Sequence, residues 1–153
     1  MAPSAEEIAK LIKSRLPGET SILLTEKNQP GSVLSLFTED FKITVVGQEF
    51  DLAYGATGIA AAKDYLIGRL TPTIFGSLDD SKAAKSEVVR VTGGGDNPWA
   101  AVEFKSTATS LKGKPWVHEC VIMLHFTDDG KITEAKAYFD TLHLQNHILD
   151  SAA

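Results

Sequence analysis

The chain has 153 residues, of which 43% are hydrophobic and 23% are charged. A chain of this length and composition can bury about two-thirds of its unfolded surface. We therefore expect a single domain over residues 1–153, with one core and no need for a stabilising disulfide or metal. The 15 basic and 20 acidic residues give a net charge of −5 without any basic run, which argues against nucleic acid as a partner.

Nothing in the sequence points to a membrane or to secretion. No apolar stretch approaches the roughly 20 residues of a membrane-spanning helix, and the first residues lack the basic and apolar regions of a signal peptide. The single cysteine, Cys120, cannot form an internal disulfide, which is typical of a reducing compartment. We expect a cytoplasmic protein without membrane contact.

Helical patterns dominate the first half of the chain. Ser4 and Glu7 have the spacing of a capping box, and the apolar residues after them repeat at helical intervals until Pro17-Gly18. This pattern predicts a first helix. Two further helices are predicted over residues 32–38 and 57–70, and a strand rich in β-branched residues over 41–46.

The second half of the chain has the pattern of strands joined by hairpin turns. The predicted strands are 87–92, 99–110, 116–127 and 131–141. A two-residue turn at Lys112-Gly113 would pair Thr107 with His118, Lys105 with Cys120, and Glu103 with Ile122. A turn at Asp129-Gly130 would pair Leu124 with Ala135, Ile122 with Ala137, Cys120 with Phe139, and His118 with Thr141.

These two registers divide the side chains between two sheet faces, because successive residues of a strand point to opposite sides. One face would carry Glu103, Lys105, Thr107, His118, Cys120, Ile122, Leu124, Ala137, Phe139 and Thr141. The other would include Val102, Phe104, Val121 and Met123. Both faces mix apolar and polar residues, so both need cover, for example helices on one and a partner subunit on the other.

The last predicted hairpin resembles that of a known superfamily. Its residues are Phe126-Thr127-Asp128-Asp129-Gly130-Lys131-Ile132, followed by Ala137-Tyr138-Phe139-Asp140. They are similar to the terminal hairpin of the nuclear transport factor 2-like superfamily, which includes SnoaL-like polyketide cyclases, ketosteroid isomerases and limonene epoxide hydrolases. Thr38-Glu39-Asp40 and the Tyr54-Gly55 turn also resemble the front half of that family.

The resemblance implies an α+β fold and a single SnoaL-like domain. The sheet would be a cone-shaped, curved antiparallel sheet, an α+β barrel, wrapped by about three helices from the N-terminal half. The concave face would hold a hydrophobic pocket for a small apolar ligand, and the convex face often forms a homodimer. Matching the hairpin puts the face with His118 and Phe139 on the concave side.

The chain departs from the family at the positions of two known mechanisms. Where the resembled hydrolases have a carboxylate, this chain has Ala137, and its first strand carries Ile43 and Val45. Where the resembled isomerases have their two Asp residues, this chain has Ile122 and Val45. The sequence therefore argues against both mechanisms.

Three polar residues of the expected concave face are the predicted catalytic residues. A carboxylate in an apolar cavity has a raised pKa and His titrates near neutrality, so Glu103 and His118 could share proton removal and return. Lys105 could steady an enolate. The predicted ligand contacts are Thr107, Cys120, Ile122, Leu124, Phe139, Thr141 and Tyr54.

A purely structural alternative is equally open. In it, Glu103 and Lys105 form an ion pair at the pocket rim, and His118 bonds to Thr107 or Thr141.

The function that these residues favour is a cofactor-independent isomerase or cyclase of secondary metabolism, acting on a polyketide- or terpenoid-like intermediate. The alternative is a non-catalytic ligand-binding or dimeric interaction module. No metal is predicted. His143 and His147 are four residues apart, a spacing found in metal sites, but no carboxylate or Cys pattern accompanies them.

Overall fold

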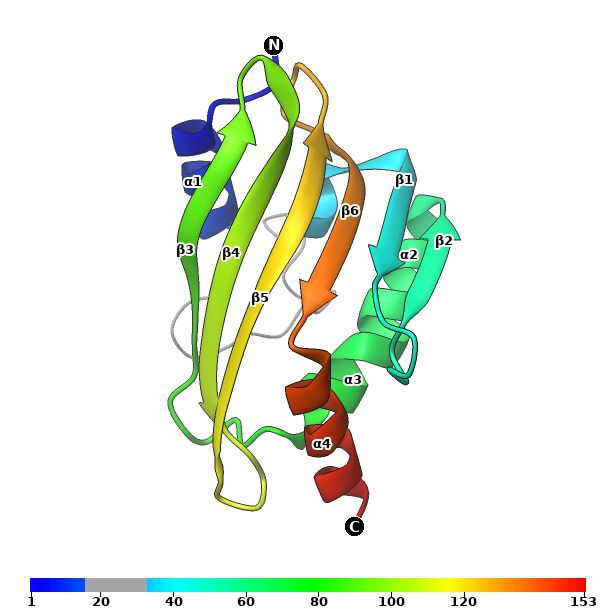
Figure 1. Cartoon of the computed structure of the whole chain (residues 1–153), viewed down its shortest axis with the longest axis vertical. Helices are drawn as coiled ribbons and strands as arrows, with labels where there is room; N and C mark the ends of the chain where they lie inside the picture. The colour runs from blue at the N-terminus through cyan, green and yellow to red at the C-terminus, as the bar shows by residue number, and fades with distance from the viewer. Residues whose placement is uncertain (16–32) are drawn as a thin grey trace.

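The computed structural model describes residues 1–15 and 33–153, which form a six-stranded sheet with helices (Figure 1). The strands are β1 (Phe37–Val45), β2 (Tyr54–Thr57), β3 (Lys85–Gly94), β4 (Asn97–Thr109), β5 (Pro115–Phe126) and β6 (Ile132–Phe139). The α-helices are α1 (Ala5–Lys13), α2 (Ile59–Tyr65), α3 (Thr71–Ile74) and α4 (Thr141–Ala152). Shorter turns are η2 (Val33–Leu36), the π-helical η3 (Leu66–Leu70) and η4 (Phe75–Ser77).

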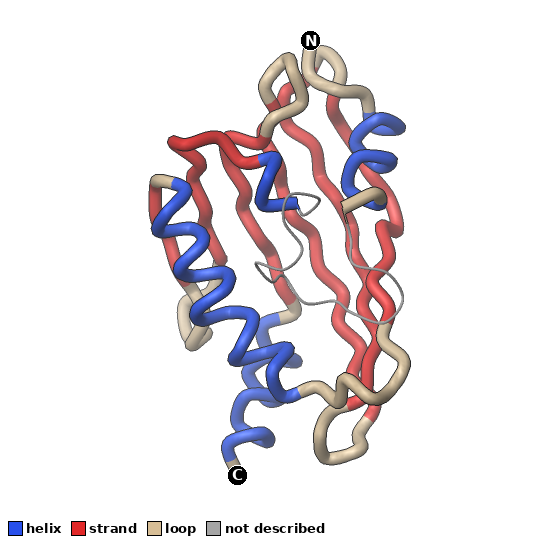
Figure 2. The backbone as a smooth tube through the Cα atoms, turned by 180° about the vertical axis from the view of Figure 1, so that it is seen from behind, coloured by secondary structure: helices blue, strands red, loops and turns tan. Residues whose placement is uncertain are grey.

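The sheet is curved and unclosed, with strand order β2-β1-β6-β5-β4-β3. Figure 2 shows α1, η2 and the α2-to-α3 run lying across one face of the sheet, which we call the inner face. This arrangement confirms the expected cone-like α+β fold. Neighbouring strands run antiparallel, except that β1 runs parallel to β6. That parallel pair, like strand β2, was not foreseen from the sequence.

The first helix forms as the capping box predicts. The Ser4 hydroxyl accepts a hydrogen bond from the backbone N–H of Glu7 at 3.3 Å, and the Glu7 carboxylate accepts one from the N–H of Ser4 at 2.8 Å. Ile8 and Ile12 face inward and are buried. The predicted end of this helix at Pro17-Gly18 lies outside the described residues.

The second long helical region begins after Gly58, close to the predicted start at residue 57. The backbone φ of Gly58 is 103°, in the region that favours glycine, and no side chain caps the helix. From Ile59 the chain stays helical through α2, η3 and α3, beyond the predicted end at residue 70. Pro72 sits in the first turn of α3, where a proline is tolerated.

Strands β4 and β5 pair one residue away from the predicted register. Val102 lies opposite Ile122, Phe104 opposite Cys120, and Ser106 opposite His118. The loop between β4 and β5 explains this difference in register.

The Ser110 N–H donates to the Lys114 carbonyl at 2.8 Å, so Leu111, Lys112 and Gly113 form a three-residue loop. Gly113 has a φ of 76°, as the last residue of such a loop requires. One extra loop residue moves every β4 side chain to the opposite face.

The β5 and β6 register is the predicted one over most of its length. Leu124 lies opposite Ala135, Ile122 opposite Ala137, and Cys120 opposite Phe139. Thr141 is different, because the chain leaves the sheet after Phe139 and Thr141 begins α4. The predicted pairing of Thr141 with His118 is therefore wrong.

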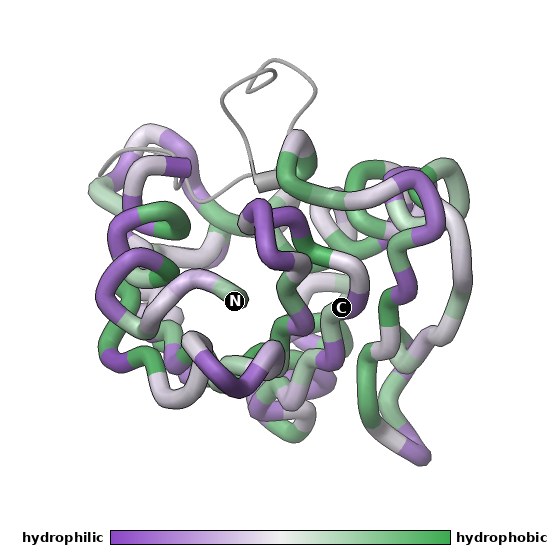
Figure 3. The backbone as a smooth tube through the Cα atoms, turned by 90° about the horizontal axis from the view of Figure 1, so that it is seen from above, coloured by the Kyte–Doolittle hydropathy of each residue, from purple (hydrophilic) through white to green (hydrophobic). Residues whose placement is uncertain are grey.

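The core lies between the inner face and the helices. Its largest fully buried side chains are Trp116, Phe41, Phe126, Ile8, Ile132 and Val102. Figure 3 shows that hydrophobic and hydrophilic residues alternate along the elements and do not form long uniform segments. Among the described residues, no helix has the length and apolar character needed to cross a membrane.

Candidate functional site

Four aromatic and imidazole rings gather where the start of β5 meets α4, and we call them the histidine cluster: Trp116, His118, His143 and His147. The centroid of the His118 ring lies 5.7 Å from Trp116 and 6.0 Å from His143. Trp116 lies 5.6 Å from His143 and 6.1 Å from His147. Three of the four histidines in the chain thus surround one tryptophan.

The backbone explains why these rings meet. Trp116 and His118 are two residues apart in β5, so both point to the inner face. Helix α4 starts directly after β6, and the Asp140 carboxylate caps it by accepting from the N–H of His143 at 3.1 Å. His143 and His147 are four residues apart and therefore share the helix face that meets β5.

His147 is held by ordinary structural contacts. Its Nε2 lies 2.6 Å from the Ser77 hydroxyl oxygen and 3.4 Å from the Ile74 carbonyl oxygen. Both partners come from the end of the α3 and η4 run. These contacts tie α4 to the helices that cover the inner face.

The other members of the cluster have polar atoms without partners. His118 is only 7% exposed, yet neither of its ring nitrogens has a hydrogen-bond partner. Trp116 Nε1, His143 Nε2 and the Thr71 hydroxyl are also buried and unpartnered. Within the described residues these five atoms are the only buried side-chain nitrogens and oxygens in that state. Folded proteins leave few such atoms, and four of the five belong to the histidine cluster, which marks the site.

Burial sets the charge state of His118. Removal from water and, to a smaller extent, neighbouring His143 lower the pKa of His118 from 6.5 to about 4, while Asp140 opposes the shift. Burial also lowers the pKa of His147. The His118 imidazole is therefore neutral at neutral pH, with one nitrogen that donates a hydrogen bond and one that accepts.

Apolar side chains surround the cluster. The Phe139 ring lies 5.5 Å from His118, and the Phe75 ring lies 6.2 Å from Trp116. Cys120 is the next inner-face residue of β5, and burial raises the pKa of its thiol to about 12. The thiol stays protonated, so Cys120 is a wall residue and not a nucleophile.

No family model matches the chain, and no curated protein matches it. Solved structures do match. An LEH-like epoxide hydrolase from M. tuberculosis has a TM-score of 0.58 at 15% identity, over 98% of this chain and 95% of that chain. TerC, co-crystallised with polyporic acid, has a TM-score of 0.59 at 21% identity, over 77% of this chain and 86% of that chain.

An NTF2-like protein of unknown function from Burkholderia pseudomallei also matches, with a TM-score of 0.59 at 15% identity, over 80% of this chain and 86% of that chain. The chain has an NTF2-like fold. The resemblance of the terminal hairpin to the nuclear transport factor 2-like superfamily is confirmed at the level of the fold. Identities this low carry the fold alone.

Three predicted site residues lie on the other face of the NTF2-like sheet. Glu103, Lys105 and Thr107 alternate with the inner-face residues of β4 and so point outward. Glu103 pairs with Arg90, whose Nε lies 2.5 Å from the carboxylate. The predicted grouping of Glu103, Lys105 and Thr107 with His118 is therefore wrong, because it depended on a two-residue turn.

The alternative contacts predicted for Glu103 and His118 are also absent among the described residues. Glu103 pairs with Arg90 where a pair with Lys105 was expected, and His118 bonds to neither Thr107 nor Thr141.

The predicted ligand contacts of β5 and β6 do share the inner face of the NTF2-like fold. Leu124 is buried, and Ile122 and Phe139 pack against the core. Tyr54 lies apart from them on edge strand β2, where its ring stacks 4.4 Å from Tyr65.

Sequence reasoning missed the role of α4. The spacing of His143 and His147 was visible in the sequence, but it was weighed only as a metal pattern. In the described part of the chain, no three His, Cys, Asp or Glu side chains gather as metal ligands. The signal that identifies the pair is its position just after β6, which turns one helix face toward the β5 residues Trp116 and His118.

An open groove of about 550 Å³ lies at the opposite end of this NTF2-like molecule. It is lined by Met1, Ala2, Pro3, Ser4, Glu7, Leu11, Gly95, Asp128, Asp129 and Gly130. Its acidic groups already have partners, since Glu7 bonds to Ser4 and Asp129 accepts from Thr127. The histidine cluster is therefore the stronger candidate site.

Proposed function

We propose that this protein is a cofactor-independent isomerase or cyclase that uses His118 to move a proton on a small, largely apolar molecule, such as a polyketide- or terpenoid-like intermediate. The observation that carries the proposal is His118 itself. It is a buried, neutral imidazole on the inner face, with both nitrogens unpartnered and Phe139 beside it. An imidazole held in this way costs stability, which a ligand in hydrogen-bond contact would offset.

The reaction that suits a neutral imidazole is proton transfer next to a carbonyl. The free nitrogen of His118 takes a proton from the carbon beside the carbonyl, and the C–H electron pair moves toward the oxygen to form an enolate. In an isomerase the imidazolium returns that proton to a different carbon. In a cyclase the enolate carbon attacks a second carbonyl, whose oxygen then takes the proton.

A base with a lowered pKa needs help from its surroundings. Asp140 raises the pKa of His118 and so favours the imidazolium that forms during the reaction. Hydrogen-bond donors placed at the enolate oxygen would supply the rest of the stabilisation of the transition state.

Two further observations support an enzyme of this kind. Matching structures include an LEH-like epoxide hydrolase and TerC with polyporic acid, so small organic molecules occur among proteins of this fold. The inner-face positions Ile43, Val45 and Ala137 are buried and apolar, which leaves no carboxylate there for the mechanism of the resembled hydrolases.

The experiment measures whether the protein exchanges hydrogen in, or converts, a ligand that it retains. Native mass spectrometry against an extract of the source organism identifies the retained molecule, which is then incubated with the enzyme in D2O. Wild type is expected to exchange carbon-bound hydrogen for deuterium, or to release an isomer. His118→Gln should lose at least about a hundredfold in this rate, because general base catalysis contributes that much.

His125→Gln is the matched control. His125 lies on the outer face, where its Nδ1 is 2.6 Å from the Thr133 hydroxyl, so its loss should leave exchange unchanged. A retained ligand that neither exchanges nor converts would overturn the enzyme proposal in favour of a non-catalytic binding module.

A further inference from the structure

The unpartnered atoms around His118 indicate which hydrogen-bonding group a ligand would need. An indole N–H can only donate a hydrogen bond, so Trp116 Nε1 needs an acceptor. The Thr71 hydroxyl is a second buried donor without a partner. Thr71 lies one helical turn before Phe75, whose ring packs 6.2 Å from Trp116. His143 Nε2 completes the set on the α4 side.

We propose that Trp116, Thr71 and His143 form a subsite, closed beneath α4, for a neutral carbonyl-type oxygen carried by a flat ring. This inference rests on the proposed function, because it supplies the oxygen contacts that a proton transfer by His118 requires. It goes further by naming the chemical group that the site recognises.

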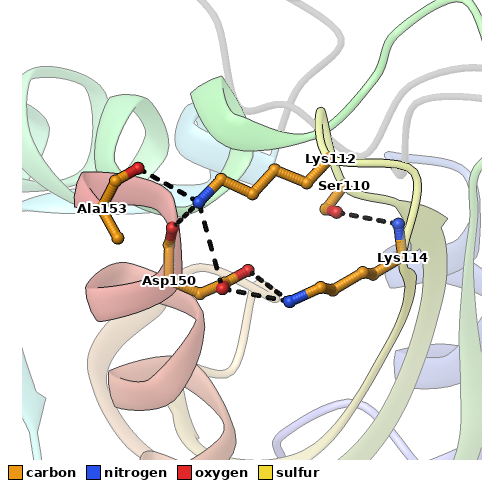
Figure 4. A network of polar contacts seen from close by, with 5 residues as sticks. All are labelled: Ser110, Lys112, Lys114, Asp150 and Ala153. Carbon is orange, nitrogen blue, oxygen red and sulfur yellow. Dashed lines mark hydrogen bonds and ion pairs between the residues drawn. The ribbon is translucent and has the colours of Figure 1, made fainter.

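The oxygen is assigned as neutral because, among the described residues, no Lys or Arg is among the charged groups that shift the pKa of His118. Lys112 and Lys114 come nearest in sequence to Trp116, and both are engaged with the C-terminal end of α4 (Figure 4). A carboxylate brought next to Trp116 would lose its water without gaining a positive partner, which is costly in a buried place. A carbonyl oxygen loses much less.

The ring is assigned from the walls. Phe75, Trp116 and Phe139 present three aromatic rings around the unpartnered atoms. Aromatic side chains pack well against flat, polarisable ligands in offset or edge-to-face geometry. A flat ring that bears a ketone or quinone oxygen satisfies both the walls and the donors.

The subsite is closed in this structure, because its three polar atoms and the two ring nitrogens of His118 have almost no solvent contact. Helix α4 is the cover, and it is lightly held: its only buried residues are Leu144 and His147. At its far end, Lys112 Nζ donates to the carbonyls of Asp150 and Ala153, and Lys114 Nζ lies 3.0 Å from the Asp150 carboxylate (Figure 4). Exposed contacts of this kind stabilise weakly, so this end of α4 can move to admit a ligand.

The test uses three probes of equal shape and different charge: 2-acetonaphthone, 2-isopropylnaphthalene and 2-naphthoate. Trp99→Phe leaves Trp116 as the sole tryptophan, so a single indole N–H signal appears in the NMR spectrum. The ketone should move that signal downfield and bind about tenfold tighter than either other probe, as expected for one hydrogen bond made or lost in a buried place.

Thr71→Val separates a binding role from a structural one. Valine has the shape of threonine without the hydroxyl, and that hydroxyl has no partner in the free protein. The variant should raise the melting temperature and weaken ketone binding several-fold. Thr133→Val is the matched control, because the Thr133 hydroxyl bonds to His125. It should lower the melting temperature and leave ketone binding unchanged.

Several results would overturn the subsite. These are equal binding of the oxygen-free probe, tighter binding of the naphthoate, no shift of the indole signal with any probe, or a lower melting temperature in Thr71→Val. Failure of the proposed function looks different. If the ketone binds as described but His118→Gln does not change the exchange of a retained ligand, the subsite stands and the base is wrong.

Discussion

His118 carries a titratable ring in a place where a proton is disfavoured. Its neighbours are the Trp116, Phe139 and His143 rings, and its nearest opposing charge is Asp140. Most buried histidines of globular proteins have at least one hydrogen-bond partner. His118 has no partner in the described residues, so it lowers the stability of the fold. The size of this effect depends on pH.

We expect the free energy of unfolding to fall as the solution is acidified from pH 6.5 to about 4. In this window the unfolded chain, with an ordinary pKa of 6.5, binds a proton that folded His118, with a pKa of about 4, does not bind. Unfolded chains are therefore stabilised relative to folded ones as pH falls. A shift of this size corresponds to roughly 3 kcal/mol. Urea titrations at pH 7, 5.5 and 4 measure it.

His118→Gln should remove the larger part of that pH dependence, leaving the smaller contribution of His147, whose pKa is also lowered by burial. An unaltered slope in His118→Gln would show that other groups titrate in this range. NMR titration of the imidazole gives a direct check, since His118 should remain neutral well below pH 6.

At the scale of the element, two hairpins with similar turn residues behave differently. Lys112-Gly113 and Asp129-Gly130 both end three-residue loops, since Ser110 bonds to Lys114 and Thr127 bonds to Lys131. In the second hairpin the register shifts again between His125 and Phe126, which cancels the extra loop residue. The first hairpin has no such bulge.

This difference explains why part of the site could be predicted and part could not. Alternation placed His118, Cys120 and Phe139 correctly on the inner face, because the loop and the bulge offset each other. The same reasoning put Glu103 and Lys105 there wrongly. The sequence pattern does not reveal whether a hairpin contains a bulge. The structure was therefore needed to decide which face of the sheet the β4 side chains occupy.

Gly113→Ala should destabilise the protein by about 1 kcal/mol, because a Cβ is strained at a φ of 76°. No atom lies within 4 Å of where the Cβ would be, so backbone conformation is the whole cause. Gly55→Ala is the control: the space around it is also open, and its φ is ordinary. Urea denaturation compares the two, and equal stabilities would contradict the three-residue loop.

Helix α4 should loosen when its far end is released. Replacing both Lys112 and Lys114 by Ala removes the contacts to Asp150 and Ala153, which are exposed and therefore weak. Amides near the end of α4 should then exchange with deuterium about threefold faster or more, as hydrogen exchange followed by NMR would show. Lys10→Ala, which breaks an exposed ion pair in α1, should not affect them.

Unchanged exchange in α4 would mean that packing alone holds the helix. Salt offers an independent check, because about 1 M salt screens exposed charges and should reproduce the effect of the double variant.

For the whole molecule, the outer face of the sheet is the surface that we expect to bind a second copy of the chain. Val117 and Tyr138 are 46% and 44% exposed there, Val121 lies directly opposite Tyr138, and Met123 is two residues further along β5. Val102 and Phe104 were first assigned to this surface, but both lie on the inner face, opposite Ile122 and Cys120. The dimer prediction therefore depends on β5 and β6.

Sedimentation at micromolar concentration should give the mass of a dimer, and Met123→Glu should give a monomer because it places a charge on this apolar surface. Lys63→Glu, on α2 across the molecule, is a control for the added charge. A monomeric wild type would remove the prediction.

The order of the sheet also has a consequence for the making of the protein. Strand β1 lies between β2 and β6, and β6 is the last strand to be synthesised. While the ribosome is still producing β3, β4 and β5, one edge of β1 has no partner, and Phe41, Ile43 and Val45 lack part of their final cover. A nascent chain in that state can pair with a neighbouring chain on the same messenger RNA. Correct folding therefore requires β6 to pair with β1 before another chain does.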